Sequence, residues 1–206
     1  MTELKTDIIS RQQIDEALSY DEYIKLIEEL LSVGKTTGEN HSESMLHYTK
    51  MSAHRMKRLD KQIQLDDALI EKISELDRNL IWLVLTEAWC GDAAQLIPLM
   101  NRIANESPYI TLKLLMRDEN LDIMDQFLTN DRSRSIPKLI CLEADALEVI
   151  GDWGPRPKDS QTLFDELRSD GELTYPVIAE RLQKWYADDR TSSAQQELLQ
   201  LINQWA

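Results

Sequence analysis

The strongest constraint on the fold of this chain is an apolar run that leads into a cysteine-containing turn and then into a helical pattern. Residues 80–86 read LIWLVLT, which is typical of a fully buried strand. The turn Trp89-Cys90-Gly91-Asp92-Ala93 follows, and a helical pattern extends from Gly91 to Asn105. Cys90 is therefore expected at a strand-to-helix turn, where the positive end of a helix can lower the pKa of a thiol.

The segments after this turn predict a βαβαββα order of elements. Strands are expected at 109–116, 137–142 and 147–150, and helices at 121–128 and 160–168. Two strands joined through a helix imply a parallel pair, and the short turn at 143–146 implies an antiparallel pair. The fold class is therefore α/β, with a mixed central sheet flanked by helices.

Both ends of the chain are predicted to be helical, which gives a division into a helical extension at 1–64, an α/β domain at 65–171 and a second helical extension at 172–206. Ser10 and Gln13 have capping-box spacing, and the apolar stripe from Ile14 to Leu31 predicts the helix that follows. Further helices are expected at 42–59, 66–76 and 175–187. Ser193 and Gln196 are expected to cap a last one.

The composition narrows the classes of partner. A formal net charge of −14 disfavours binding to nucleic acid or to an anionic membrane surface. The basic run at 55–61 is the local exception, and it fits either a solvated helix face or a docking patch for an acidic partner. Asp7, Arg11 and Asp15 interrupt the first apolar steps, and two cysteines make no disulfide framework, so we expect a cytoplasmic protein without a signal peptide.

The element order and the turn at Cys90 together resemble the thioredoxin superfamily. Pro98 lies inside the first helix of the α/β region, where thioredoxins often carry a kinking proline, and Ser135-Ile136-Pro137 precedes a strand, where the superfamily places its cis-proline. The resemblance covers residues 65 to 170. It is nearest to bacterial thioredoxin-like proteins with a long helical N-terminal extension, and for that group it implies a fold and a site without a firm substrate.

The resemblance implies that Cys90 is the catalytic residue and that Trp89, Gly91, Asp92, Ile136 and Pro137 bind the substrate. A cis bond before Pro137 would bring the Ile136 backbone beside Cys90. The helix end favours a Cys90 thiolate, whereas the Asp92 carboxylate disfavours it. Cys90 is accordingly either a nucleophile near neutral pH or an inert small residue.

The main departure from the superfamily is Ala93, which stands where a dithiol oxidoreductase has its second cysteine. Val84 also replaces the buried acid that many thioredoxins carry six residues before the first cysteine. These losses leave thiol–disulfide exchange of monothiol type, resolved by an external thiol. The partner would be a protein or a low-molecular-weight thiol or disulfide. The alternative is a protein-binding module without turnover.

Other candidate chemistry is weak. Cys141, in an apolar strand, is either a structural residue or a resolving thiol. His47 and His54 lie two helical turns apart, and with His41 they make no zinc pattern, so no metal and no cofactor are expected. Trp153 and Arg156 either shape a pocket together, or Trp153 packs against a helix and Arg156 is solvated. The oligomeric state is left open.

Overall fold

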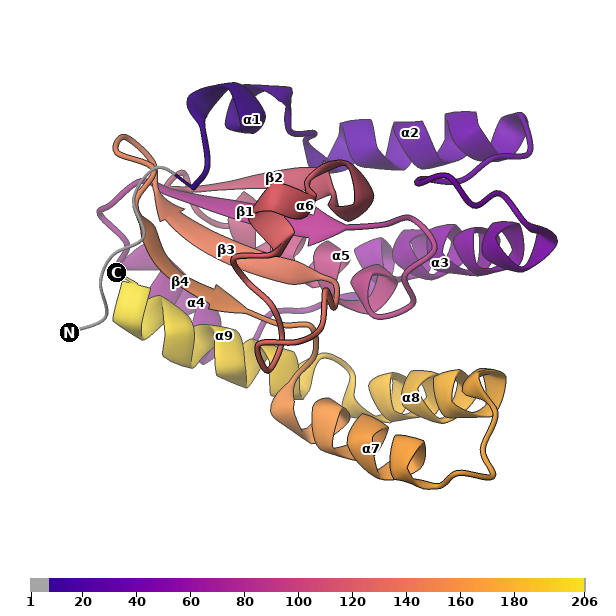
Figure 1. Ribbon diagram of the computed structural model, residues 1–206. Helices are drawn as coiled ribbons and strands as arrows, with labels where there is room; N and C mark the ends of the chain where they lie inside the picture. Colours follow the sequence, from indigo (N-terminus) through magenta and orange to yellow (C-terminus); the bar gives the residue numbers. More distant parts are fainter. Residues whose placement is uncertain (1–7, 206) are drawn as a thin grey trace.

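The computed structural model describes residues 8–205, which form a four-stranded sheet with helices on both faces and at its sides (Figure 1). Residues 1–7, with Asp7, and residue 206 lie outside the described part. No helix within residues 8–205 has the length and apolar character needed to cross a membrane.

The strand order is β2-β1-β3-β4, and the pairing is mixed as predicted. β1 (Leu80–Thr86) is parallel to β2 (Ile110–Met116) and antiparallel to β3 (Lys138–Glu143), which pairs with β4 (Val149–Trp153) in antiparallel fashion. Every residue of β1 is buried, because it is a central strand covered on both faces. The sequence-predicted α/β fold is therefore confirmed.

Two of the helices predicted inside the α/β region are close to their expected bounds, whereas the one expected at 121–128 ends at Met124 and follows an unpredicted 3-10 turn. The helices of this region are α5 (Ala93–Asn105), the single turn η1 (Arg117–Glu119), the short α6 (Leu121–Met124) and α7 (Lys158–Ser169). α5 begins at Ala93 rather than at Gly91, so Cys90 precedes the helix by three positions. Pro98 lies within α5.

The N-terminal helix differs from its prediction because it is divided in two. α1 (Arg11–Glu16) carries the predicted capping box of Ser10 and Gln13, but it ends before Ala17. A second capping box, formed by Ser19 and Glu22, starts α2 (Tyr20–Ser32). Between the helices, Leu18 exchanges backbone hydrogen bonds of 2.9 and 2.8 Å with Leu114 of β2. The apolar stripe therefore predicted one helix where the Leu18–Leu114 pairing separates two.

The remaining helices are α3 (Glu43–Gln62), α4 (Asp67–Ser74), α8 (Tyr175–Asp189) and α9 (Ser192–Trp205). Ser42 caps α3, close to the predicted start. The predicted cap of the last helix is wrong, because Ser193 and Gln196 both lie inside α9. The Ser193 N–H instead donates to the Asp189 carboxylate at 3.2 Å.

The flanking helices contribute to the same core as the sheet. Tyr23 of α2, Met56 of α3 and Leu198 of α9 all belong to the main apolar cluster around β1. α7 and α8 form a hairpin, side by side at the lower edge of Figure 1, with a small cluster of their own, Leu167, Ile178 and Leu182, while Tyr186 of α8 joins the main cluster. The domain boundaries at 64/65 and 171/172 remain a prediction.

Gly154 fixes the approach of the α7–α8 hairpin to the sheet. Its φ is +113°, and a Cβ at this position would collide with the backbone oxygen of Pro137. Only glycine accommodates both the positive φ and this close approach of the Pro137 oxygen. The Gly154–Pro155 bond is cis, and the chain then passes through Arg156 into α7. This turn brings Arg156 next to the cysteine-containing segment.

Candidate functional site

Cys90 lies between the start of α5 and the segment before β3. The Ile136–Pro137 bond is cis, as predicted, and the Cys90 thiol donates a hydrogen bond of 3.3 Å to the Ile136 carbonyl oxygen. The Ala93 N–H in turn points to the sulfur at 3.5 Å. Ile136 and the helix start therefore contact Cys90 from two sides, which is the predicted juxtaposition.

Burial has the largest effect on the thiol of Cys90. Its pKa is raised to about 12, chiefly by burial and then by the neighbouring Asp92 carboxylate, whereas the Ala93 and Asp92 N–H groups and Arg156 act in the opposite direction. The hydrogen bond to Ile136 also requires the protonated thiol. Of the two opposing effects visible in the sequence, the helix end does not prevail in this conformation, because desolvation outweighs it. In this conformation the sulfur is held as a thiol.

Asp92 connects the cysteine segment to the α7–α8 hairpin. Its carboxylate pairs with Arg156 at 2.7 Å, and it accepts a hydrogen bond of 2.9 Å from the Tyr186 hydroxyl of α8. Both partners are largely buried, and the exposed fractions of the Arg156 and Asp92 side chains are 12% and 10%. The guanidinium also stacks on Phe164 of α7, 4.1 Å from the ring centroid. Asp92 is therefore a structural anchor as well as a neighbour of the thiol.

A second set of contacts joins α8 to the same segment. Gln95 donates to the side chain of Gln183 at 2.7 Å, and Gln183 donates to the Gly91 carbonyl at 3.5 Å. A Cβ at Gly91 would lie 3.1 Å from Gln183 Nε2 and 4.0 Å from an Arg55 guanidinium nitrogen of α3. Gly91 is thus enclosed by side chains of both α3 and α8.

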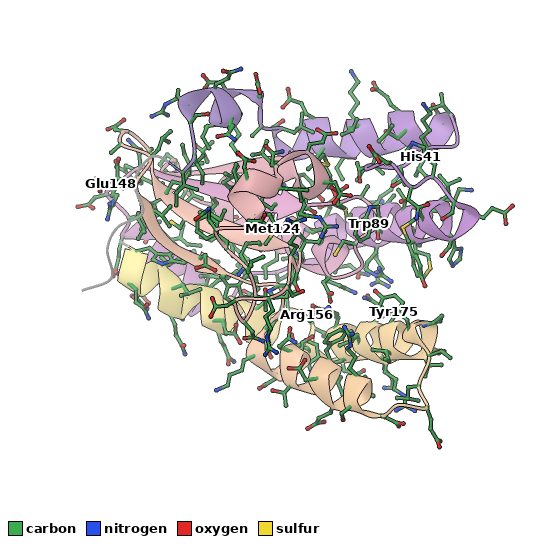
Figure 2. All side chains as sticks on the ribbon, in the orientation of Figure 1. His41, Trp89, Met124, Glu148, Arg156 and Tyr175 are labelled. Atoms are coloured by element: carbon green, nitrogen blue, oxygen red, sulfur yellow. The ribbon has the colours of Figure 1, made fainter. Side chains whose placement is uncertain are left out.

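These elements enclose a cavity of about 790 Å³ between α3, α8 and the Cys90 turn. Four arginines contribute to its wall: Arg55, Arg117, Arg134 and Arg156. The acidic residues of the wall are Asp92 and Glu180. Trp89, Arg156 and Tyr175 lie on this side of the molecule, where α3 faces α8 (Figure 2). A small molecule that entered this cavity would meet the Cys90 turn.

The structure brings most of the predicted site residues together. Trp89, Cys90, Gly91, Asp92 and Ile136 all contribute to the cavity wall, whereas Pro137 follows Ile136 behind it. The two candidates from the segment after β3, Trp153 and Arg156, lie in different surroundings. Arg156 reaches the cavity, but Trp153 packs toward α9, where its indole N–H donates to Glu197 at 2.7 Å.

Sequence reasoning missed the part of the cavity that α8 provides. Tyr175, Gln183 and Tyr186 carried no signal beyond a helical pattern. The one usable signal was the basic run at 55–61, of which Arg55 faces the cavity while Lys57 and Arg58 are exposed. That run is therefore partly a site wall and partly a solvated face.

Cys141 occupies a structural position. It is fully buried within β3, opposite Trp82 of β1 and Gly151 of β4, and burial raises its pKa to about 12. Ile136 touches Cys90, and five residues of extended chain separate Ile136 from Cys141, roughly 16 Å. A disulfide needs Cα atoms within about 7 Å. Both cysteines are free, and the geometry favours the structural interpretation of Cys141.

A buried carboxyl group lies near the site at a position that sequence reasoning did not single out. Val84 is buried among apolar residues as expected, but Glu87, three residues before Cys90, is also fully buried. Burial raises the pKa of Glu87, and its carboxylate accepts the Asp118 N–H at 2.9 Å. Glu87 therefore secures the chain after β1 to the chain after β2.

No cluster of three or more His, Cys, Asp or Glu side chains within residues 8–205 is arranged to hold a metal ion. His47 contributes to the cavity wall, and the ring of His41 accepts the Thr36 N–H at 3.4 Å. The three histidines are thus in separate surroundings on and before α3.

The comparisons with known proteins agree with this geometry. A family model described as thioredoxin matches residues 38–168, which is more than half of the 206 residues. The chain belongs to the thioredoxin family. The matched region contains the whole sheet, Cys90 and the cis bond before Pro137. It does not include α8, which closes the cavity.

Two solved structures resemble this chain over nearly its full length. A protein of unknown function from Pseudomonas aeruginosa has 18% sequence identity and a TM-score of 0.62, and the alignment covers 96% of this chain and 99% of that one. An HIV epitope scaffold has 18% identity and a TM-score of 0.54, with 90% and 98% covered. At this identity the likeness concerns the fold. No curated protein matches the chain significantly.

Proposed function

We propose that this thioredoxin-family protein carries out thiol–disulfide exchange of monothiol type, with Cys90 as the nucleophile. The observation that carries the proposal is the position of the Cys90 sulfur in the wall of an approximately 790 Å³ cavity, between the Ile136 carbonyl and the Ala93 N–H. Trp89, Gly91, Asp92, Ile136 and Pro137 surround the place where a disulfide would bind.

The proposed exchange balances without a second protein cysteine. The Cys90 thiolate attacks one sulfur of a disulfide, the S–S bond breaks, and the other sulfur leaves as a thiolate. A thiolate from an external thiol then attacks the mixed disulfide and regenerates Cys90. Ala93 cannot resolve the mixed disulfide, but its N–H can stabilise the Cys90 thiolate.

The raised pKa requires that the site changes before the attack. Since burial is the largest cause of the shift, access of water or ligand to the sulfur lowers the pKa toward that of an ordinary thiol. The contacts that cover Cys90 from α8 are polar side-chain bonds to Gly91, Asp92 and Gln95, and the α7–α8 hairpin has its own apolar cluster. We therefore take the described conformation as the resting state.

The test uses a neutral small disulfide, 2-hydroxyethyl disulfide, and intact-mass spectrometry between pH 7 and 9. Wild type and Cys141→Ser are expected to form one adduct that a small thiol releases, whereas Cys90→Ser forms none. Cys141→Ser is the matched control because that thiol lies in the sheet. Absence of any adduct on wild type after hours, while the denatured chain reacts, would falsify the exchange function.

The second candidate function is a binding module without turnover. A Cys90 pKa of about 12 in the resting state favours it, as does Ala93 in place of a resolving thiol. In that case a ligand of wild type would bind Cys90→Ser with equal affinity, and the adduct experiment would remain negative.

A further inference from the structure

The cavity beside Cys90 has the size of a small-molecule site. Its volume of about 790 Å³ falls within the roughly 300–1,000 Å³ that is usual for ligand pockets. Its wall includes apolar side chains from three elements: Met45 and Met51 of α3, Ile136 before β3, and Leu182 of α8. Because α3 and α8 both stand over the Cys90 turn, a small molecule fits this space better than the surface of a folded protein.

The four arginines of the wall differ in their partners. Arg156 pairs with Asp92 at 2.7 Å, Arg134 with Asp125 at 2.6 Å, and Arg117 with Asp118 at 2.6 Å. Arg55 differs from these three, because it has no ion pair or side-chain hydrogen bond to another residue within the described 8–205. Arg55 is nevertheless partly buried, and burial lowers its pKa, whereas the Asp92 carboxylate, which is already paired with Arg156, acts on it only from a distance in the opposite direction. A desolvated guanidinium without a hydrogen-bonded anion is costly, so this position favours an anionic ligand.

The position of Arg55 relates this charge to the sulfur. A Cβ at Gly91, the residue after Cys90, would lie 4.0 Å from an Arg55 guanidinium nitrogen. An anionic group held by Arg55 is therefore close enough to the Cys90 turn to belong to the same small molecule as a reacting sulfur. A single unpaired guanidinium matches one carboxylate, which it can bind through two parallel hydrogen bonds.

We infer that the substrate of Cys90 is a small disulfide that carries a carboxylate, and that Arg55 binds this carboxylate while the disulfide faces the sulfur. This inference rests on the proposed exchange function, and it adds the substrate class and a specificity residue. Arg55 comes from α3, and it would select the substrate by charge in a protein whose net charge is −14.

The test compares three disulfides of similar length: 3,3′-dithiodipropionic acid (anionic), 2-hydroxyethyl disulfide (neutral) and cystamine (cationic). Rates of adduct formation at Cys90 are divided by the rates for the urea-unfolded chain, which removes the intrinsic reactivity of each compound. Wild type is expected to prefer the dicarboxylate over the neutral compound by about 10-fold or more, since hydrogen bonds to charged groups contribute about 1.5–3 kcal/mol.

The matched variants are Arg55→Gln and Arg58→Gln, which remove the same charge from α3. Arg58 lies outside the wall of this cavity. Arg55→Gln is expected to abolish the preference for the dicarboxylate, Arg55→Lys to retain part of it, and Arg58→Gln to leave it unchanged. Far-ultraviolet circular dichroism checks that each variant is folded. Equal preferences in wild type and folded Arg55→Gln, or a preference for cystamine, would overturn the inference.

A second measurement separates this inference from the exchange function. Binding of 3,3′-dithiodipropionic acid to Cys90→Ser is followed by nuclear magnetic resonance titration, with Arg55→Gln and Arg58→Gln in the same background. Saturable binding that only Arg55→Gln weakens, by about 10-fold, supports the carboxylate site even if no compound reacts with Cys90. If the neutral disulfide reacts but this binding is absent, the exchange function stands and the substrate class is wrong.

Discussion

Cys90 and Cys141 are both buried thiols with a pKa raised to about 12, but their surroundings differ in kind. Cys141 lies in the middle of β3 with a paired strand on each side. Cys90 contributes to a cavity wall beside the α7–α8 hairpin, which has a small apolar cluster of its own and joins the main core through Tyr186. We therefore expect exposure of Cys141 to require opening of the sheet, and exposure of Cys90 to require only movement of the hairpin.

This difference shows that a raised thiol pKa does not by itself mark a structural cysteine. At Cys90 burial is the largest cause, at a position that borders a cavity, and the added effect comes from the single carboxylate of Asp92. At Cys141 burial within the sheet is the only cause that raises the pKa. Four predictions test how far this contrast extends, in order of decreasing effect.

The largest expected effect is on native-state labelling by an alkylating reagent. Cys90 should react on the order of 1,000-fold faster than Cys141 or more, because Cys141 becomes accessible only through global unfolding. Time-resolved intact mass of Cys141→Ala and Cys90→Ala reports each thiol separately. Equal rates in the two variants would remove the distinction between the two environments.

Loosening the hairpin should expose Cys90 selectively. Leu167→Ala removes a buried side chain from the small α7–α8 cluster without touching the cavity wall, and large-to-small core changes of this kind cost about 2–5 kcal/mol. Labelling of Cys90 should therefore accelerate by about 30-fold or more, with little change for Cys141. Leu198→Ala in α9, within the main core, is the control. If Leu198→Ala accelerated Cys90 selectively as well, the hairpin would not be the covering element.

Neutralising Asp92 should lower the pKa of Cys90. Asp92→Asn removes the carboxylate that raises this pKa, and it leaves the positive charge of Arg156 nearby. We expect alkylation of Cys90 at pH 8 to increase about 10-fold, which corresponds to a change of one pKa unit. The variant should also lose about 3 kcal/mol of stability in urea, because Arg156 becomes a buried unpaired charge. An unchanged pH profile would exclude Asp92 as a cause.

The smallest effect concerns stability at alkaline pH. A thiol with a raised folded-state pKa contributes stability that is complete below about pH 8.5 and is lost as the pH rises toward 12, by up to about 1.4 kcal/mol per pH unit. Cys90→Ala and Cys141→Ala should each make the fall in urea midpoint between pH 8.5 and 10 less steep than in wild type. Here the two cysteines should behave alike, and a large difference would show that one pKa is less shifted.

Much of the sheet, and the turn that carries Cys90, could be predicted from the sequence. The LIWLVLT run specifies a buried strand, and a strand followed by Trp89-Cys90-Gly91 and a helical pattern specifies the turn. The resemblance that these residues carry then placed Ile136 and Pro137 beside Cys90. These features rest on local patterns or on one strong motif, and so one sequence contains enough information for them.

The environment of Cys90 could not be predicted in the same way. Asp92 meets Tyr186 94 positions further along the chain, and no local pattern in α8 indicates this contact. The direction of the Cys90 pKa shift could not be predicted for the same reason, because the helix end and Asp92 are visible in the sequence whereas the burial of the sulfur is not. The division of the first helix differs from the prediction because the apolar stripe from Ile14 to Leu31 continues past Ser19 and Glu22, whose capping box starts a new helix.

The backbone pairing of Leu18 with Leu114 has a consequence for the behaviour of the protein at high concentration. β2 is an edge strand, and the exposed N–H and C=O groups of such a strand can recruit a second molecule by intermolecular β-pairing. The segment between α1 and α2 occupies part of this edge and is held there by two hydrogen bonds. The N-terminal segment thus helps to keep the chain from aggregating through its sheet.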